Sequence, residues 1–169
     1  HYNRKFNVEK KDGKKYFINF EGVASCFYLY INGVFAAYSQ VSHNTSEVDI
    51  TDLLNNGENT IDVVVVKWCD GSYLEDQDFF RLSGIFREVY ILSRNKVRLT
   101  DVYIRQNVSE DLSKCTLNIE CDLTDKAPVL YGLIAPGGMV LKNGESDSAN
   151  FLIEIDKPLL WNDEKPYVY

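Results

Sequence analysis

The sequence predicts an all-β fold made of two β-sandwich domains. Short segments alternate between apolar and polar residues, and turn signals separate them. The clearest turn is Asn32-Gly33 between two apolar runs, because both positions of a type I′ hairpin turn need positive φ. Helical signals amount to one turn, which Thr51 or Asp52 can cap. Roughly six strands in the first half of the chain are typical of a jelly-roll sandwich.

Two strands of this first domain differ in how their apolar residues are distributed. Residues 14–20 alternate as a half-buried strand does, with Tyr16, Ile18 and Phe20 on one side. Residues 61–68 are instead a continuous, mostly β-branched run, which is typical of a central strand covered on both faces.

A polar hinge at residues 93–96 follows the last strand of the first domain, residues 87–94. We therefore place the jelly-roll domain at residues 1–94 and an immunoglobulin-like β-sandwich at residues 95–169, and we expect both to be incomplete. The strands expected in the second domain lie in residues 97–108, 114–123, 127–136, 139–145 and 150–158.

Two details of the second domain are predicted. Leu117, Ile119, Cys121 and Leu123 should share one face of their strand, since side chains alternate along a strand. Asn143-Gly144 is a candidate for a second Asn-Gly turn.

Charge and composition exclude several classes of function. The 169 residues carry a net charge of −7, so neither nucleic acid nor an anionic membrane surface would attract the chain. No apolar run is long enough to cross a membrane, and the first ten residues are too polar for a signal peptide. Neutral ligands, cations and protein partners are compatible with this composition.

The cysteines indicate a reducing environment. No CxxC spacing occurs, and the chain has only two histidines, which argues against a zinc site. We expect free thiols and therefore a cytoplasmic protein. The four cysteines are Cys26, Cys69, Cys115 and Cys121.

An acidic and aromatic segment, WCDGSYLEDQDFFRLSGIFREV at residues 68–89, interrupts this pattern. If the preceding strand keeps its parity, Val64, Val66, Trp68 and Asp70 share a face, and Asp70 lies at the rim of the sandwich. A carboxylate there can bind a hard cation or sugar hydroxyls. The alternative is a turn aspartate that caps the two following backbone N–H groups.

Three further acids, Glu75, Asp76 and Asp78, allow two interpretations. Two carboxylates roughly 5 to 10 Å apart would suit a glycosidase. However, Arg81 and Arg87 offer matching cations in the same segment, and Arg–carboxylate pairs that fix a loop are the commoner outcome. We therefore favour structural pairing.

The stretches FEGVASCFYLYINGVFAAYSQ and EVDITDLLNNGENTIDVVVVKWCDGSYLEDQDFFRLSGIFREV closely resemble the amino-terminal sugar-binding domain of glycoside hydrolase family two. The DGSYLEDQD…RLSGIFR string is similar to the β-galactosidases of that family rather than to its glucuronidases or mannosidases. The later KPLLWNDEKPYVY resembles the end of the family's first immunoglobulin-like domain.

This resemblance implies a whole protein that hydrolyses terminal β-galactosides with retention, through a covalent glycosyl-enzyme. The family's catalytic glutamates lie in a TIM barrel that would follow Tyr169, so the resemblance implies no catalytic residue in this chain and no activity for the chain alone. The aspartate of the family's Trp-x-Asp-Gly-Ser motif contacts galactose and a sodium ion, and Asp70 matches it. The other sodium ligands, and those of magnesium, belong to the barrel, and a substrate-binding asparagine would precede His1. Relatives are often homo-oligomers.

The chain departs from the family pattern in three places. Residues 41–51 replace a usual Arg-Leu-Pro segment, which changes local loop contacts. Cys69 stands where Ser is usual, and Phe79-Phe80 replaces Met-Trp. The last two changes are conservative enough to leave the expected role of Asp70 intact.

Two rival functions are compatible with the sequence. A stand-alone carbohydrate-binding module with a fibronectin-like spacer would bind galactosides by itself. In a purely structural or adhesive sandwich, replacing Asp70 would have no effect on sugar handling.

Overall fold

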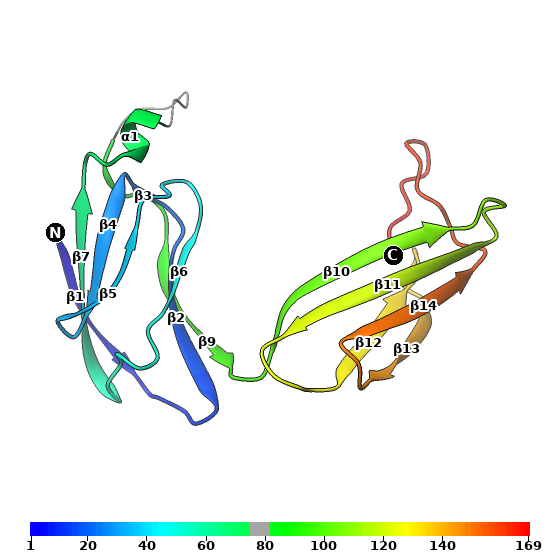
Figure 1. Cartoon of the computed structure of the whole chain (residues 1–169), viewed down its shortest axis with the longest axis horizontal. Coiled ribbons are helices and arrows are strands. Elements are labelled where there is room, and N and C mark those ends of the chain that lie inside the picture. The colour runs from blue at the N-terminus through cyan, green and yellow to red at the C-terminus, as the bar shows by residue number, and fades with distance from the viewer. Residues whose placement is uncertain (75–81) are drawn as a thin grey trace. The chain divides into compact units, whose positions relative to one another are not determined.

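The computed structural model describes residues 1–74 and 82–169, and it confirms an all-β chain. The chain divides into two compact units, residues 1–96 and 97–169, each built from layered antiparallel strands (Figure 1). The division falls in the polar segment expected to be a hinge. Within the described residues no helix is long and apolar enough to span a membrane, and α1 (Gly71–Leu74) has four residues.

The first unit is a sandwich of two main sheets. One sheet, in the order β1-β7-β4-β5, consists of β1 (Tyr2–Val8), β7 (Gly57–Val66), β4 (Cys26–Ile31) and β5 (Val34–Ser39). The other, in the order β6-β2-β9, consists of β6 (Ser46–Asp49), β2 (Lys14–Phe20) and β9 (Val89–Asn95). A short pair, β3 (Val23–Ala24) and β8 (Gly84–Ile85), contacts β7.

Side chains from both main sheets fill the core of this unit. Tyr16, Ile18 and Phe20 all point inward from β2, as predicted, and the Phe20 ring packs 4.5 Å from that of Phe27. The half-buried character expected of this strand is wrong, because its other face is covered too. Phe17 on that face is 8% exposed, since the Arg94 guanidinium of β9 lies 5.2 Å from its ring.

The expectation that β7 is covered on both faces is also wrong for the described residues. The strand is central in its sheet, and Val63 is 3% exposed. Val64 and Val66, however, are each 37% exposed, because only one face of this sheet packs against the other sheet. The strand ends at Val66, before Trp68.

Two turns test the local predictions. The hairpin between β4 and β5 is confirmed, with φ of 53° at Asn32 and 79° at Gly33. The turn after Ile50 is one hydrogen-bonded turn rather than a helix. Its cap is Asp49, whose Oδ1 accepts the Thr51 N–H at 3.0 Å, so the capping role predicted for Thr51 or Asp52 is wrong.

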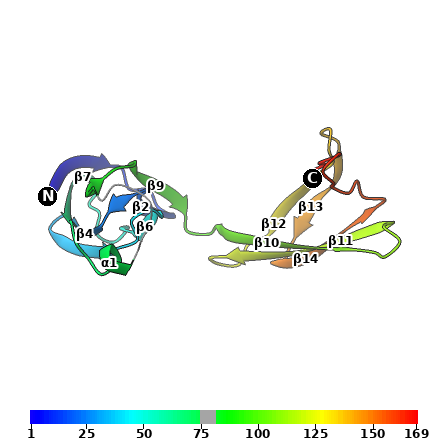
Figure 2. The same ribbon diagram turned by 90° about the horizontal axis from the view of Figure 1, so that it is seen from above.

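The second unit has two layers, which Figure 2 shows from another side. One layer, in the order β10-β11-β14, consists of β10 (Leu99–Val108), β11 (Lys114–Leu123) and β14 (Asn150–Asp156). The other pairs β12 (Val129–Ile134) with β13 (Val140–Ser146). The rings of Tyr131 and Phe151 lie 4.9 Å apart and join the layers.

The turn predicted at Asn143-Gly144 is wrong, because both residues lie inside β13. The hairpin turns instead at Gly137 and Gly138, which have φ of 99° and 93°. Glycine adopts these angles without the steric cost that other residues meet, so the pair decides where the chain reverses. The face predicted for β11 lines the core, where Ile119 is buried and Leu117 and Cys121 are partly buried.

Candidate functional site at the end of strand β7

The segment after β7 is held by hydrogen bonds within itself and by one from Ser25, the residue before β4. The Ser25 hydroxyl donates to the Lys67 carbonyl at 2.7 Å. The Cys69 N–H donates to Ser72 Oγ at 3.1 Å, and the Ser72 N–H donates to the Cys69 carbonyl at 3.0 Å. These bonds form a tight turn that leads directly into α1.

Asp70 lies in the middle of this turn and is exposed. Its backbone carbonyl accepts the N–H groups of Tyr73 and Leu74 at 3.0 and 3.2 Å. Its carboxylate forms no hydrogen bond or ion pair with any residue in the ranges 1–74 and 82–169. The alternative of an aspartate that caps Gly71 and Ser72 therefore lacks its hydrogen bond, and Ser72 stabilises the turn instead.

Exposed aromatic rings accompany Asp70. Trp68 and Tyr73 are 52% and 79% exposed, with ring centroids 6.2 Å apart, and Lys67 Nζ lies 5.4 Å from the Trp68 ring. Since β7 ends at Val66, strand parity does not extend to these residues as the sequence suggested. An aromatic face beside a carboxylate can stack on a sugar ring or pack against another domain.

The surface beneath the turn is nearly closed. A hollow of about 20 Å³ beside Cys69 and Gly71 has room for about one water molecule. A sugar at Asp70 would therefore lie on the surface and would need contacts from outside this segment.

Asp70 offers one hard oxygen ligand, which suits a sodium ion. Among the described residues, no three His, Cys, Asp or Glu side chains are close enough to form a metal site. Asp70 can therefore fit such an ion only as one member of a shared ligand set.

The remaining acidic-segment predictions fall mostly outside the described residues. Glu75, Asp76, Asp78 and Arg81 lie in residues 75–81, so their pairing stays a prediction. Arg87 is described, and it donates to the carbonyl oxygens of His43 at 3.2 Å and Glu21 at 3.4 Å.

Glu21 lies beside Arg87, near the carboxyl-terminal end of the 68–89 segment. Hydrogen bonds from Tyr90 and Thr45 hold the pKa of its carboxyl below the usual value, with a further contribution from the nearby Arg87 charge. These contacts of Arg87 and Glu21 connect three parts of the chain that are far apart in the sequence, residues 21, 43–45 and 87–90.

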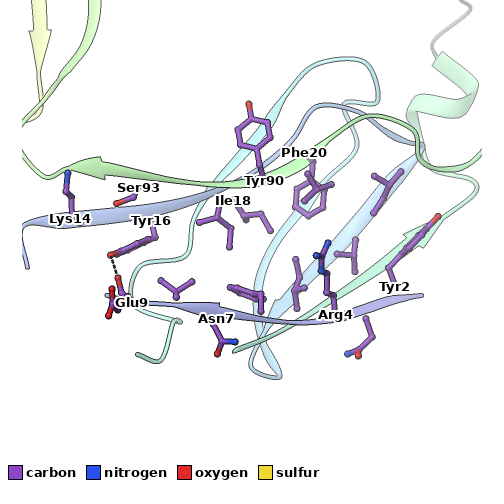
Figure 3. A pocket seen from close by; sticks show the side chains of 18 of the residues that line it. Tyr2, Arg4, Asn7, Glu9, Lys14, Tyr16, Ile18, Phe20, Tyr90 and Ser93 are labelled. Atoms are coloured by element: carbon purple, nitrogen blue, oxygen red, sulfur yellow. Dashed lines mark hydrogen bonds between the residues drawn. The ribbon is translucent and has the colours of Figure 1, made fainter. Parts of the chain in front are cut away.

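A separate cleft of about 940 Å³ lies between the sheets of the first unit, along β1 and β9 (Figure 3). Its lining is mainly aliphatic and aromatic, and includes Ile18, Phe20, Ile61, Val63 and Ile91. Asp70 does not line it. Such a lining suits apolar side chains better than sugar hydroxyls, which need convergent polar groups.

The cleft is bounded by two strand edges. Among the described strands, β1 pairs only with β7, and β9 pairs only with β2. At one end of the cleft, the Tyr16 hydroxyl donates to the Glu9 carbonyl at 3.1 Å (Figure 3). An extended segment could add to either free edge and place alternate side chains inside.

Residues 1–95 match the family described as glycosyl hydrolases family 2, sugar binding domain. The chain belongs to this family. The resemblance noted in the sequence is thereby confirmed, and the site at Asp70 lies within the part of the family 2 chain that matches.

Curated relatives of this family 2 chain are named β-galactosidases. The chain is 46% identical over 99% of its length to the one from Actinobacillus pleuropneumoniae, and 42% identical over 100% of its length to the one from Staphylococcus xylosus. It covers 16% and 17% of these proteins, so it spans about a sixth of their length.

Solved structures have the same fold. The chain superposes on an FMN-binding β-glucuronidase from Facaelibacterium prausnitzii L2-6 with a TM-score of 0.78 at 21% identity, over 98% of this chain and 28% of that one. It superposes on a β-glycosidase from Bacteroides vulgatus with a TM-score of 0.71 at 26% identity, over 98% and 22% of the two chains. These likenesses support the two-sandwich architecture.

Proposed function

We propose that this chain is a non-catalytic amino-terminal part of a retaining β-galactosidase that removes terminal β-D-galactose from β-galactosides. The observation that carries the proposal is the 46% identity to a named β-galactosidase over 99% of this chain. Retaining glycosidases need two carboxyl groups about 5 Å apart, one as nucleophile and one as acid and base. We place both in a TIM barrel outside residues 1–169, which also supplies the ligands of a magnesium ion, in a homo-oligomeric enzyme.

Within that enzyme, Asp70 would bind and orient the galactosyl group. Its exposed carboxylate can accept hydrogen bonds from sugar hydroxyls, and the turn around Cys69 and Ser72 holds it at the end of a rigid strand. Asp70 would also contribute one ligand to a sodium ion, which when bound supplies positive charge beside the sugar oxygens. The other ligands would come from the barrel.

We also propose that the apolar cleft is filled by another segment of the same polypeptide, amino-terminal to His1. The cleft has free strand edges on both sides and an apolar lining. Leaving such a lining in water costs roughly 25 cal/mol per Å². The two β-galactosidase relatives have most of their polypeptide outside the part that this chain matches.

The role of Asp70 is tested by Asp70→Asn in the full-length enzyme. Losing one hydrogen bond to a charged group, worth about 1.5–3 kcal/mol, should raise the KM for a β-galactoside about 10- to 100-fold and weaken the dependence on sodium. Asp12→Asn, which removes another exposed carboxylate from a turn of the same unit, is the matched control and should change neither. An unchanged KM and sodium dependence for Asp70→Asn would refute the role.

The absence of catalysis is tested with residues 1–169 alone and a chromogenic β-galactoside. We expect no turnover above background. Turnover would mean that the catalytic carboxylates lie within this chain.

The rival function, a stand-alone carbohydrate-binding module, makes a different prediction. Such a module should bind galactosides measurably in calorimetry without any other domain. We expect no binding heat, because Asp70 and the exposed rings beside it provide too few polar contacts and no enclosed pocket.

A further inference from the structure

Two of the four cysteines lie close together where β4 begins and β7 ends. Cys26 is the first residue of β4 and pairs with Val66, the last residue of β7. Its thiol lies 3.9 Å from the Val66 carbonyl oxygen. The chain then bends at Lys67, which the Ser25 hydroxyl anchors, and brings Cys69 back toward the start of β4.

The two thiols belong to one cluster of side chains. The Cys69 and Tyr38 side chains lie near enough to the Cys26 thiol to affect its pKa. The Cys69 sulfur also lies 3.7 Å from Ser72 Oγ. The pairing register of β4 and β7 and the turn at Ser72 therefore hold both sulfurs in place.

The two cysteines differ in accessibility. Cys26 is 3% exposed, and burial raises the pKa of its thiol, so this group stays protonated and unreactive by itself. Cys69 is partly exposed and lines the small hollow under the turn. A small oxidant can reach Cys69 but not Cys26.

We propose that Cys26 and Cys69 form a redox-active pair that a peroxide converts into an intramolecular disulfide. The Cys69 sulfur attacks one peroxide oxygen, the O–O bond breaks, and a sulfenic acid and one water form. The Cys26 sulfur then attacks the Cys69 sulfur, an S–S bond replaces the S–O bond, and the leaving hydroxide takes the Cys26 proton to form a second water. Two thiols lose two electrons in total, and one peroxide is reduced to two waters.

This bond would link the segment next to Asp70 to a buried core strand. Cys69 immediately precedes Asp70, and the turn that both share is held by local hydrogen bonds and by the bond from Ser25 to Lys67. Oxidation should therefore reduce the freedom of the turn. A thiol reductant should restore it.

The other two cysteines provide an internal control. Cys115 and Cys121 lie on the same strand, β11, six positions apart, which is roughly 20 Å at the rise of an extended strand. Cysteines bridge only when their Cα atoms are about 4.4–6.8 Å apart. These two cannot pair with each other.

The test is disulfide mapping of residues 1–169 after exposure to hydrogen peroxide. Remaining thiols are alkylated, and the protein is digested with trypsin without reduction. Cleavage after Lys67 places Cys26 and Cys69 in different peptides, residues 16–67 and 68–81. We expect these two peptides to be linked in monomeric protein, with Cys115 and Cys121 recovered alkylated, and we expect dithiothreitol to release the link.

Variants separate the two steps. In Cys69→Ser, Cys26 should remain reduced, because the oxidant cannot reach it. In Cys26→Ser, Cys69 should oxidise beyond sulfenic acid or form bonds between molecules. Recovery of Cys26 as a free thiol in wild-type protein whose Cys69 is fully oxidised would overturn the proposal. Links that involve Cys115 or Cys121 as often as the link between Cys26 and Cys69 would overturn it too.

Discussion

The carboxylate of Asp70 should contribute almost nothing to the stability of the chain, although it lies at the start of a helical turn. Replacing an aspartate that caps such a turn by alanine typically lowers the free energy of unfolding by 0.5–2 kcal/mol, and by about 1 kcal/mol in most cases. Here the carboxylate reaches no backbone N–H among the described residues, and Ser72 Oγ accepts the N–H of Cys69 at 3.1 Å. We therefore expect Asp70→Ala to change the free energy of unfolding by less than about 0.5 kcal/mol, as an exposed substitution does.

Ser72→Ala is the matched comparison, because it removes the hydrogen bond that the structure contains. Its loss should cost about 1 kcal/mol, the net value of one partly buried hydrogen bond. The order of effects is thus the reverse of what a capping aspartate would produce.

Urea unfolding followed by tryptophan fluorescence measures both variants. Trp161 lies in the second unit, so a Trp161→Phe background leaves Trp68 as a reporter of the first unit alone. This avoids a mixed transition from two units, for which one free energy would not be defined. A loss of 1 kcal/mol or more in Asp70→Ala would refute the reasoning and restore the capping interpretation.

Other predictions concern the same chain. Asn59→Leu should lower the free energy of unfolding by about 2–3 kcal/mol in urea titrations. The Asn59 amide is 1% exposed and makes four hydrogen bonds, each worth about 1 kcal/mol. The buried leucine side chain should recover part of this loss. Gly33→Ala should cost about 1 kcal/mol at φ 79°, although no atom obstructs the new Cβ. The pKa of Asp111 should be about 2 by NMR, because the Ser109 and Ser113 hydroxyls donate to its carboxylate, and Ser109→Ala should raise it. Since this folded pKa lies below the unfolded value of about 3.9, its stabilisation is complete above that value and is lost as pH falls toward 2. The open cleft should bind a fluorescent apolar dye in residues 1–169, and the signal should fall when the polypeptide amino-terminal to His1 is present; an equal signal would contradict the proposed filling.

Local signals predicted much of the first unit correctly. The Asn32-Gly33 turn needs two residues at positive φ, a requirement that its own sequence meets, and the hairpin forms there. The alternation in β2 likewise predicted which side chains face the core. The same kind of signal failed at Asn143-Gly144, because Gly137-Gly138 reverses the chain earlier and leaves the Asn-Gly pair inside β13.

The candidate site was predictable in part. The resemblance to the family motif selected Asp70 as the candidate, whereas spacing alone left it between a ligand and a cap, and its binding role stays a prediction. The exposed rings of Trp68 and Tyr73 were missed as a pair, because strand parity was extended beyond the end of β7. The nearest breaker residues, Gly71 and Ser72, come only after Asp70, so no local signal marked the end of the strand at Val66.

By itself, the sequence determined the all-β class, the strands and hairpin that depend on neighbouring residues, and the family through the motif around Asp70. The tertiary structure alone decided that β7 is covered on one face, that Ser72 rather than Asp70 holds the turn, and that Cys26 lies beside Cys69. The physical reason is that periodicity says which face of a strand a side chain occupies but not which strand lies opposite. Antiparallel register supplies that partner, and here it pairs Cys26 with Val66 across forty positions of sequence and so brings Cys69 within reach.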